Sequence, residues 1–501
     1  MKPKIPVLLI ILGLSLLFFS YGNTKSPSSL YKNRIEKNIY AVNLKPISDF
    51  TFDELVKLSS LAEPGGELKA KLDSHLSMVY VVNKNNNTAK SDKPYIRVAQ
   101  WNIKRGYNIA AIKEILTDPE SYERKYNANI KAGDRNNLKD ELTNFFNADI
   151  LCLNEVDIGM PRTKYDNVVG ELADFLKRDY AYATEFVEVG PLFQKEKVDK
   201  LLYKGLHGNA IISKYPIVSA QVIRLPNHYD WYRGEVQKKE SPLERFRKFG
   251  AKAIFRQHIE SREVRHGSRN AIIADIKIPN NKIITVVLTH FEDRAYPDER
   301  FNQFKFLLDK IKNKNTPLVL TGDFNTSTTD TKPTSFQKEV EKRIRDPHFF
   351  LRQAAFIPIP FVPVAGGLAA VALSKLLQYK DPFFPSIPVL FPNHERKFFT
   401  YLKKFRFSDG YGFDLSGDKK RSSNHKGGLL ANSNQRHWKG FKSTYKLEEP
   451  RIIAYFKLDW FFIKSVGNYM KPFNARTLRT LNYSFPGHIS DHNPITVDLS
   501  F

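Results

Sequence analysis

Cysteine is almost absent from this sequence, because Cys152 is the only one among 501 residues. A single cysteine cannot form a disulfide within the chain, which excludes a fold held together by disulfides. Stability must therefore come from a buried core and from any bound metal. Cys152 itself lies in the apolar run Ile150–Leu153, which predicts a buried position in a strand and no catalytic role.

Acidic residues are the second scarcity. The chain has 78 Lys and Arg against 53 Asp and Glu, a formal net charge of +25. Such an excess points to a polyanionic partner such as nucleic acid, anionic lipid or an envelope polymer. Charge alone does not choose among these, and a generally lysine-rich composition is the alternative.

Long uncharged runs are also few, and the first of them predicts export. Residues 5–19 are mostly apolar, follow Met-Lys-Pro-Lys, and lead into small residues around 20–22. This is the pattern of a secretory signal peptide over residues 1–22. An uncleaved N-terminal membrane anchor is the alternative, although 15 residues are few for a bilayer span of about 20. We therefore expect a periplasmic, cell-envelope or secreted protein.

Residues 23–94 are expected to form an N-terminal extension and linker. The segment 52–58 is amphipathic, and residues 83–93 form a polar linker. We expect the extension to pack on the main domain, which covers residues 95–501.

Strand-like and helix-like segments alternate from residue 96 onward. Residues 96–101 alternate like a strand, and the runs at 149–153, 283–288 and 317–320 are also typical of strands. Strands alternating with helices predict the α/β class. Helical spacing recurs in three sets: Ile109, Ile112 and Leu116; Leu138, Leu142 and Phe145; and Phe304, Leu307, Leu308 and Ile311.

Polar residues stand repeatedly at or beside the ends of apolar runs. Carboxylates, amides and imidazoles delivered to strand ends are how an α/β scaffold assembles a metal-assisted hydrolytic site from distant sequence. The blocks are scattered from residue 102 to 492, so no cut leaves a complete site on either side, and we expect one domain. The blocks are Trp101–Asn102, Asn154–Glu155, Thr289–His290, Thr321–Asn325, Leu458–Trp460 and Ser490–Pro494.

In their order along the chain and in their amino acids, these blocks resemble the motifs of the endonuclease/exonuclease/phosphatase superfamily of metal-dependent phosphoesterases, over roughly Arg97 to Phe501. That superfamily includes deoxyribonucleases, abasic-site endonucleases, bacterial sphingomyelinases and inositol-phosphate phosphatases. The resemblance implies an α/β four-layer sandwich of two packed mixed β-sheets flanked by helices, with an insertion at about 327–400. His290 matches the histidine of the deoxyribonuclease and sphingomyelinase branches, where abasic-site enzymes have a tyrosine.

A metal site is expected around Glu155, whose carboxylate follows a buried apolar run. Mg²⁺ prefers one or two carboxylates together with water and substrate phosphate. The resemblance implies that Glu155 is the principal ligand, with Asn102 beside it, and that Asp491 contacts either the metal or the structure. Mg²⁺ is the expected cofactor and Mn²⁺ the alternative. One metal versus two stays open.

A catalytic group of five residues is implied in the same way. A histidine with a carboxylate partner is fixed in one tautomer and stabilised as imidazolium, as proton transfer near neutral pH requires. The resemblance makes Asp459 the partner of His492, which would activate water, while Asp323 aligns that water. Asn325 and His290 would stabilise the charge on pentacovalent phosphorus. Whether His492 or Asp323 is the general base stays open.

Three further expectations concern phosphate contacts. Asp323 and Asn325 are two residues apart, so in extended backbone their side chains would face the same way. Asn209 matches a family strand in which the asparagine can touch phosphate, although the same pattern also serves the sheet alone. Arg269, just before an apolar run, is a candidate phosphate clamp.

An uncharged segment at 353–374 departs from the compact family pattern. A transmembrane span there would place Glu155 and Asp323 on one side of the bilayer and His492 on the other, so spanning is excluded. Burial, contact with a membrane interface and oligomerisation remain as alternatives.

The segment 391–446 departs from the pattern through its composition. It holds 13 Lys or Arg against four Asp or Glu, interleaved with 11 aromatic residues. Basic and aromatic residues together can bind single-stranded nucleic acid or anionic headgroups, whereas a solvated loop whose aromatics face the domain is the alternative. Residues 407–412 within it resemble a family loop near the site, so we expect part of the segment to line the site.

Together these features predict an exported Mg²⁺-dependent hydrolase of phosphate esters, with a nuclease acting on DNA or RNA phosphodiesters as the leading hypothesis. The first alternative is a sphingomyelinase-like phospholipid phosphodiesterase at membranes, favoured by export and by residues 353–374. The second is a non-catalytic surface-binding protein on the same scaffold. It is disfavoured because every core position of the site is present.

Overall fold

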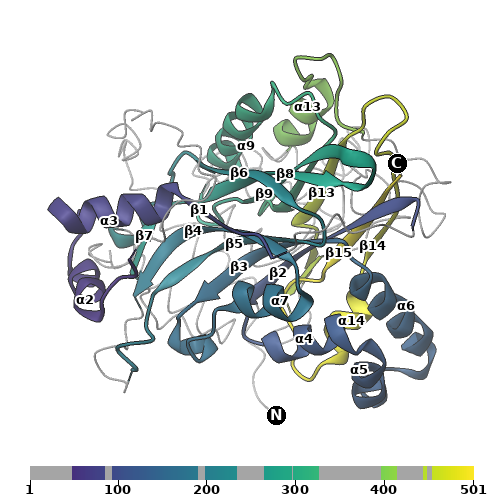
Figure 1. Ribbon diagram of the computed structural model, residues 1–501, viewed down its shortest axis with the longest axis horizontal. Helices are drawn as coiled ribbons and strands as arrows, with labels where there is room; N and C mark the ends of the chain where they lie inside the picture. Colours follow the sequence, from purple (N-terminus) through teal and green to yellow (C-terminus); the bar gives the residue numbers. More distant parts are fainter. Residues whose placement is uncertain are drawn as a thin grey trace, which may run out of the picture. The chain divides into compact units, whose positions relative to one another are not determined.

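Two mixed sheets and several helices make up the protein in the computed structural model (Figure 1). The expected signal peptide at 1–22 and the run 353–374 lie outside the described residues, as does most of the expected insertion at 327–400. All described residues belong to one unit, Asn38–Phe501, and they are 48–84, 93–189, 198–233, 264–295, 297–326, 396–414, 444–447 and 454–500.

The larger sheet is built around two parallel strands, β2 (Tyr95–Arg105) and β3 (Ile150–Ile158). Its other pairs are antiparallel. Among the described residues it has eight strands in the order β1-β4-β5-β3-β2-β15-β14, with β7 paired to β4. The remaining strands are β1 (Val79–Val82), β4 (Asp179–Val189), β5 (Leu206–Ser213), β7 (Val264–Gly267), β14 (Pro472–Thr477) and β15 (Ile495–Ser500).

The smaller sheet has the strand order β13-β10-β9-β8-β6 within the described part of the chain. Its parallel pair, β9 and β10, approaches so closely at Gly322 that a Cβ there would lie 1.8 Å from the carbonyl oxygen of Thr289. Gly322 also has a φ of +142°, so glycine is required at this position. The strands are β6 (Ile217–Arg224), β8 (Asn270–Ile278), β9 (Lys282–His290), β10 (Leu318–Asp323) and β13 (Asp459–Lys464), and a separate hairpin joins β11 (Tyr445–Leu447) to β12 (Ala454–Phe456).

Alternate residues of the central strands face the other sheet and the outer helices. In β3, Ile150 and Cys152 lie in the core between the sheets, whereas Leu151 and Leu153 pack in a different cluster against helices. This is the two-residue period of a pleated strand. Val286 of the smaller sheet shares the first cluster, so the two sheets pack face to face. Cys152 is buried in its strand, as predicted.

Helices cover the outer face of each sheet (Figure 1). On the larger sheet, Trp101 packs edge-on against Phe145 of α6, and on the smaller one Phe304 of α9 stacks on Phe398 of α13 with ring centroids 3.7 Å apart. The predicted α/β four-layer sandwich is confirmed, and α4, α6 and α9 fall on the three sets of helical spacing. The helices are α2 (Phe52–Ser60), α3 (Gly66–Ser77), α4 (Ile109–Thr117), α5 (Pro119–Tyr126), α6 (Arg135–Phe146), α7 (Val168–Leu176), α9 (Pro297–Ile311), α13 (Arg396–Lys404) and α14 (Arg479–Ser484).

The N-terminal extension contributes directly to the larger sheet. Helix α2 begins with a capping box between Thr51 and Glu54, which satisfies two backbone amides at its start. Its Leu58 is buried in a cluster with Val187 of β4. Strand β1 then pairs antiparallel with β4 as an edge strand. The sheet therefore begins before residue 95, within the segment interpreted as an extension.

The described aromatics of the segment 391–446 are mostly core residues. Phe398, Phe405, Phe407 and Phe413 are buried on the outer face of the smaller sheet. They cannot stack on a nucleic-acid base there, so for these residues the alternative that the aromatics face the domain is correct.

Residues 407–412 do not line the site. Asp409 forms an ion pair with Lys464, at the end of β13 opposite to Asp459. Ser408 N–H donates to the carbonyl oxygen of Lys312 at 3.0 Å. The loop 407–412 is therefore not a wall of the site, because β13 separates the two ends by its full length. The part of the segment 391–446 that does reach the site is Tyr445, whose ring centroid lies 5.0 Å from that of His492.

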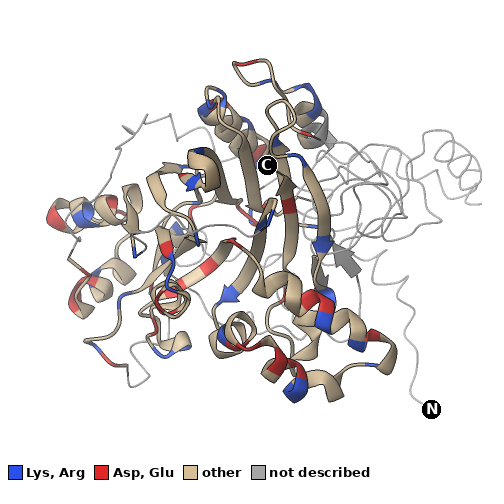
Figure 2. Cartoon of the chain, turned by 45° about the vertical axis from the view of Figure 1, so that its right-hand side comes forward, with Lys and Arg blue, Asp and Glu red and all other residues tan. Residues whose placement is uncertain are grey.

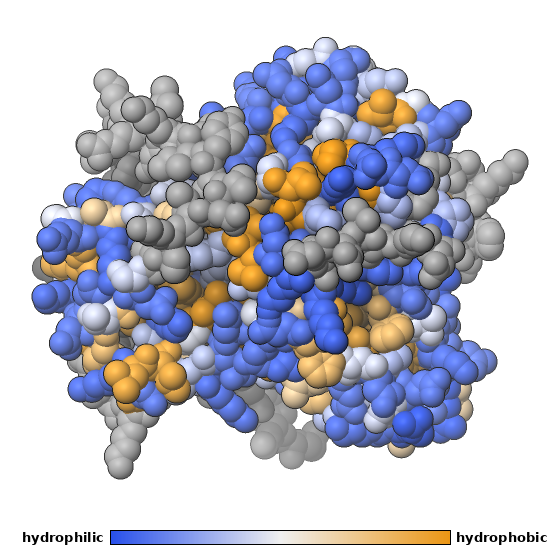
Figure 3. All heavy atoms as spheres, viewed as in Figure 1, coloured by the Kyte–Doolittle hydropathy of each residue, from blue (hydrophilic) through white to orange (hydrophobic). Residues whose placement is uncertain are grey.

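Polar residues cover much of the described surface. Figure 2 shows basic and acidic residues interleaved on the outer helices. In Figure 3 the helices at the top and lower right are largely hydrophilic, and apolar atoms show mainly in the middle of the view, over the sheets. No helix in the described ranges is both long and apolar enough to cross a bilayer.

Candidate active site

Along the central strands, the side chains that face the opposite sheet change from apolar to polar toward one end of the strands. In β10, Val319 belongs to the inter-sheet core, and the next residues of its row are Thr321 and Asp323. The same change occurs in the neighbouring strands, so polar groups of both sheets meet between them. The buried polar residues at this edge are Gln100, Asn102, Asn154, Glu185, Asn209, Asn270, His290, Asp323 and Asp459.

Asp323 lies at the centre of this group. Sheet register places it beside His290 on β9 and beside Asp459 on β13. One of its carboxylate oxygens therefore collects groups from both sheets and from the C-terminal block. The atoms around Asp323 Oδ2 are Asn102 Nδ2 at 3.2 Å, His290 Nε2 at 3.6 Å and His492 Nε2 at 3.6 Å.

His492 is held by a carboxylate at one ring nitrogen. Its Nδ1 lies 2.8 Å from Asp459 Oδ2, and its backbone carbonyl accepts from the indole N–H of Trp101 at 2.8 Å. Burial acts to lower the pKa of His492, but Asp459 and Asp323 outweigh it and raise the pKa to about 9. Without a metal the ring is therefore imidazolium at neutral pH, with Nε2 nearest to Asp323.

His290 also has a carboxylate nearby, Glu185, which the sequence patterns did not reveal. Glu185 Oε2 lies 3.4 Å from its Nδ1, and Arg269 Nη1 lies 2.9 Å from the same nitrogen. Burial would raise the pKa of Glu185, but Arg269 and His290 lower it to about 2, so this carboxyl is ionised at neutral pH. Glu185 continues the inward row of Ala181 and Ala183 in β4, and that parity is the signal that could have found it.

Glu155 reaches the site through a β-bulge. The inward row of β3 runs through Asn154, so regular pairing would point Glu155 outward. Instead the register slips between Leu153 and Val156, and Glu155 has a φ of 55°, which non-glycine residues seldom adopt. Its Oε1 consequently accepts from Asn102 Nδ2 at 3.1 Å. The bulge thus turns the carboxylate into the site.

The Glu155 carboxyl is held in its ionised form. Burial would raise its pKa, but the charges of His290, His207 and Arg105 and the hydrogen bond from Asn102 bring it below the usual range. A strained backbone that presents an ionised carboxylate is typical of a functional position.

A chain of buried amides links the two sheets behind the site. Asn154 Nδ2 donates to Asn209 Oδ1 at 2.8 Å, and Asn209 Nδ2 donates to Asn270 Oδ1 at 2.9 Å. Asp323 N–H donates to Asn154 Oδ1 at 3.0 Å, so the chain fixes the backbone that carries Asp323. Both ends of the Asn209 amide are used inside the protein, which favours its role in the sheet over the predicted contact with phosphate.

Asn325 follows Asp323 in a tight turn. Its φ is 45°, its N–H donates to Asp323 Oδ1 at 2.8 Å, and its Nδ2 donates to the carbonyl oxygen of Phe291 at 3.0 Å. The expectation that both side chains face the same way along extended backbone is therefore wrong. The turn still keeps Asn325 beside the central carboxylate.

Arg269 is placed behind His290 among carboxylates. Its Nη1 lies 2.9 Å from Glu185, its Nε 3.6 Å from Glu292, and its Nη2 3.6 Å from Asp293. The side chain is 4% exposed. This corrects the expectation of a phosphate clamp, because the guanidinium orients His290 and neutralises buried acids.

Asp491 is half-buried on the irregular segment before β15. Ser490 Oγ donates to its Oδ1 at 3.3 Å. The cluster of potential metal ligands among the described residues contains its neighbour His492 but not Asp491. The structure thus places Asp491 beside the site and leaves its predicted contact with metal unsupported.

Two sets of donors around Asp323 could hold a cation. The ligand atoms of Asp323, Asp459 and His492 lie within 4.8 Å of one another. However, Asp459 and His492 already bond to each other at 2.8 Å, which fits a proton-transfer pair better than two metal ligands. Glu155 and Asp323, bridged by Asn102 Nδ2, offer two carboxylates, the hard oxygen donors that Mg²⁺ prefers. This second set fits a magnesium ion.

Several solved structures resemble this chain at low identity. They include an endonuclease/exonuclease/phosphatase from Beutenbergia cavernae DSM 12333 (13% identity, covering 82% of this chain and 72% of that chain, TM-score 0.37). They also include the human Nocturnin catalytic domain with bound sulfate anion (15%, 84% and 97%, 0.36) and a 3'-5' exonuclease from Neisseria meningitidis (12%, 81% and 100%, 0.36). Scores this low do not by themselves assign a fold or an activity.

The sequence itself identifies the family. No curated protein sequence is significantly similar to the chain. Residues 99–344 match the sequence model of the Endonuclease/Exonuclease/phosphatase family. This range contains Asn102, Glu155, His290 and Asp323, and the fold brings these side chains together with the C-terminal His492. The chain therefore belongs to the endonuclease/exonuclease/phosphatase family.

Proposed function

We propose that this chain is an exported, Mg²⁺-dependent phosphodiesterase whose substrate is a nucleic acid. Enzymes of the family are hydrolases that act on phosphate esters. One observation carries the proposal: two imidazoles, each backed by a carboxylate, face one oxygen of Asp323 at 3.6 Å. At this spacing the two rings and Asp323 do not hydrogen-bond closely to one another, and all three can contact one water or phosphate oxygen that binds beside them.

Each of the two histidines has a separate role in the proposed reaction. His492 Nε2 takes the proton of the attacking water as the water oxygen bonds to phosphorus, and Asp459 stabilises the imidazolium that forms. The bond from phosphorus to the leaving oxygen breaks, and that oxygen takes up a proton from solvent. Arg269 donates to His290 Nδ1, which leaves the proton of His290 on Nε2, where it can be donated to a phosphate oxygen. Asp323 lies between the rings and orients the water.

Glu155 and Asp323 would hold the metal. Enzymes of this family generally depend on a divalent metal, and bound here Mg²⁺ would draw charge from the phosphate oxygens and offset the attraction of Asp323 for His492. Since Asp323 is one of the two main causes of the raised pKa of His492, this pKa would then fall toward neutrality, where a general base works best.

A nucleic-acid substrate is supported by the charge of the chain and by the rim of the site. The net charge is +25. Directly after Asn102, Lys104 is exposed, Arg105 is half-buried, and Tyr107 is 46% exposed. Cations that contact phosphates and an aromatic ring that stacks on a base are the usual means of binding single strands. The phospholipid alternative rests on residues 353–374, which lie outside the described residues.

The test is a substrate panel with the purified mature protein. We expect hydrolysis of single- or double-stranded nucleic acid with Mg²⁺, none in EDTA, and slower or no hydrolysis of phospholipids and sugar phosphates. Faster hydrolysis of a phospholipid than of any nucleic acid would reject the substrate assignment. Activity that persists in EDTA would reject the metal.

Export is tested separately by N-terminal sequencing of the protein from its native cell. Cleavage near residue 22 and recovery outside the cytoplasm are expected. An intact N-terminus on cytoplasmic protein would contradict export without touching the chemistry.

A further inference from the structure

Gln100 is a buried amide that links the larger sheet to the smaller one beside the candidate active site. It lies on β2, and its side chain has no exposed surface. Its Nε2 donates to Oδ1 of Asp459 on β13 at 2.9 Å and to Oδ1 of Asn154 on β3 at 3.1 Å. One nitrogen therefore joins the carboxylate that holds His492 to the amide chain behind the site.

The orientation of the Gln100 amide is fixed because both of its neighbours are acceptors. Asn154 presents its oxygen to Gln100, since Asp323 N–H donates to the same oxygen at 3.0 Å. The nitrogen of Asn154 is used elsewhere, where it donates to Asn209 at 2.8 Å. If the Gln100 amide were turned over, its own oxygen would face a carboxylate and a second carbonyl oxygen, and these repel it. Gln100 is therefore a donor at this position.

The contact with Asp459 fixes the plane of that carboxylate. Within the described part of the chain, Gln100 makes the only side-chain hydrogen bond to Oδ1, while His492 Nδ1 lies 2.8 Å from Oδ2. A carboxylate bonded through one oxygen can still turn about its Cβ–Cγ bond, for which the preference is broad. Bonded through both oxygens, it cannot. The direction of the His492 ring therefore depends on Gln100.

The contact with Asn154 connects Gln100 to Asp323. The oxygen of Asn154 accepts from the backbone N–H of Asp323 as well as from Gln100. Asp323 Oδ2 and His492 Nε2 lie 3.6 Å apart, and each is tied to Gln100 through one intervening residue. Misplacement of reacting groups by about 1 Å can lower a rate by about 10²-fold, so this distance matters for turnover.

We infer that Gln100 is a positioning residue, whose amide sets the Asp459–His492 pair at a fixed distance from Asp323. The expected effect on turnover rests on the proposed function. The hydrogen bonds themselves do not, because they are present without substrate or metal. Gln100 acts through its two neighbours and has no contact with the reacting atoms.

The first measurement compares the kinetics of Gln100→Met and the wild type on a soluble diester, bis(4-nitrophenyl) phosphate, with saturating Mg²⁺. Methionine has a similar length but donates no hydrogen bond. We expect kcat to fall about 10–100-fold, because the lost bond goes to a charged group and the base is then misplaced. KM should change less than about twofold, since Gln100 does not bind substrate.

The second measurement follows the proton on His492 Nδ1 by NMR, in metal-free protein without substrate. Its absence in His492→Ala identifies the resonance. We expect the resonance to shift in Gln100→Met, because the released carboxylate changes the hydrogen bond that it accepts. Gln303→Met is the matched control and should leave the resonance in place, since Gln303 is also a buried amide but bonds to Glu292 N–H and to the carbonyl oxygen of Pro226.

Each outcome decides the inference. An unchanged kcat in Gln100→Met, or a His492 resonance that stays in place, would overturn it. So would an equal shift in Gln303→Met, because any lost buried amide would then have the same effect. If a thermal melt shows that Gln100→Met does not fold, Gln100→Asn replaces it with the same expectations, since its amide is shorter by one methylene. A wild type that hydrolyses no phosphodiester would overturn the proposed function alone, and the resonance would still decide the role of Gln100.

Discussion

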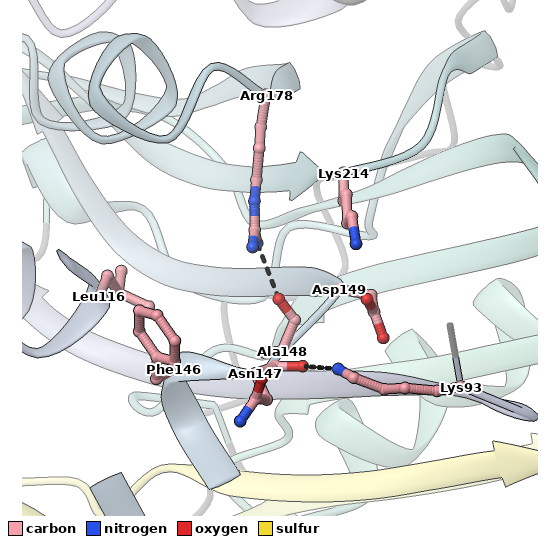
Figure 4. Close-up of a pocket in the computed structure, with 8 residues that line it drawn as sticks. All are labelled: Lys93, Leu116, Phe146, Asn147, Ala148, Asp149, Arg178 and Lys214. Carbon is pink, nitrogen blue, oxygen red and sulfur yellow. Dashed lines mark hydrogen bonds between the residues drawn. The ribbon is translucent and has the colours of Figure 1, made fainter. Parts of the chain in front are cut away.

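The two ends of β2 and β3 carry opposite chemistry on the same pair of strands. At one end Asn102 and Glu155 join the buried acids of the catalytic edge. At the other end Lys93, Arg178 and Lys214 surround Asp149 (Figure 4). The two strands run parallel, but their register slips only at the end that carries Glu155, so the bulge and the side chains beyond the core together decide the chemistry of each end. The acidic end suits a cation, and each variant below should affect one end only.

The largest expected effect is the loss of proton transfer at the acidic end. His492→Ala should lower kcat by about 10²–10⁴-fold, because a positioned general base contributes that much. The half-saturating Mg²⁺ concentration should hardly change, since His492 bonds to Asp459 rather than to Glu155. Steady-state kinetics at several metal concentrations measure both values, and full activity in this variant would remove His492 from the mechanism.

Removal of the proposed metal ligand should come next. Glu155→Ala should raise the Mg²⁺ concentration for half-maximal activity at least roughly 10–100-fold, because mutation of residues that only hydrogen-bond to metal ligands already costs this much affinity. Glu120→Ala, which removes an exposed carboxylate on α5, is the control and should behave like the wild type. An unchanged Mg²⁺ requirement would assign the metal to another set of residues.

The second histidine pair should matter less than the first. Glu185→Gln keeps the shape of the side chain but removes the charge that accepts from Arg269, the residue that donates to His290 Nδ1, and hydrogen bonds to charged groups contribute about 1.5–3 kcal/mol. We therefore expect kcat to fall about tenfold or somewhat more, with KM little changed. A thermal melt separates this from damage to the fold. A variant with the kcat of the wild type would show that Glu185 only neutralises the charge of Arg269.

Asp459→Asn should change the titration of His492. The pKa of about 9 depends on Asp459 as the main attractive charge, so it should fall in the metal-free variant. A raised pKa stabilises the folded state fully below the unfolded value of about 6.5 and loses this effect as pH rises through 9. The wild type should therefore lose up to about 3 kcal/mol of stability between these pH values, and the variant less. NMR titration and denaturant melts check this, and a pKa unmoved by the substitution would contradict it.

The smallest effect is expected from the basic end. Lys214→Gln should leave turnover within about twofold of the wild type, because effects of distant sites are nearly independent. A large loss of turnover would mean that Lys214 influences the catalytic end, and the two ends would then not be independent.

Local sequence was sufficient to predict much of the scaffold. The runs around Ile150 and Val286 have strand character, and the helical spacing at Ile112 and Leu307 falls within α4 and α9. Backbone hydrogen bonding and side-chain periodicity decide these elements over a few residues, so they can be read from a short window. The blocks at strand ends were likewise visible, and the structure brings Asp323, His290 and His492 together.

Other features depended on contacts between distant residues. The parity of β4 could have shown that Glu185 faces inward, but Glu185 meets His290 across about a hundred residues of sequence, so no local pattern identifies its partner. The aromatic residue Phe405 was open to two readings, and packing against the smaller sheet decided for the core.

The sequence by itself determined which side chains stand at strand ends, because periodicity and polarity are local. Only the tertiary structure decided how they are used. A bulge points Glu155 into the site, against the alternation of its strand, and the side chain of Asn209 is hydrogen-bonded to Asn154 and Asn270. The orientation of Glu155 follows from the register between strands, and the hydrogen bonds of Asn209 follow from the requirement that buried polar groups find partners. Neither feature is determined until the two sheets have packed together.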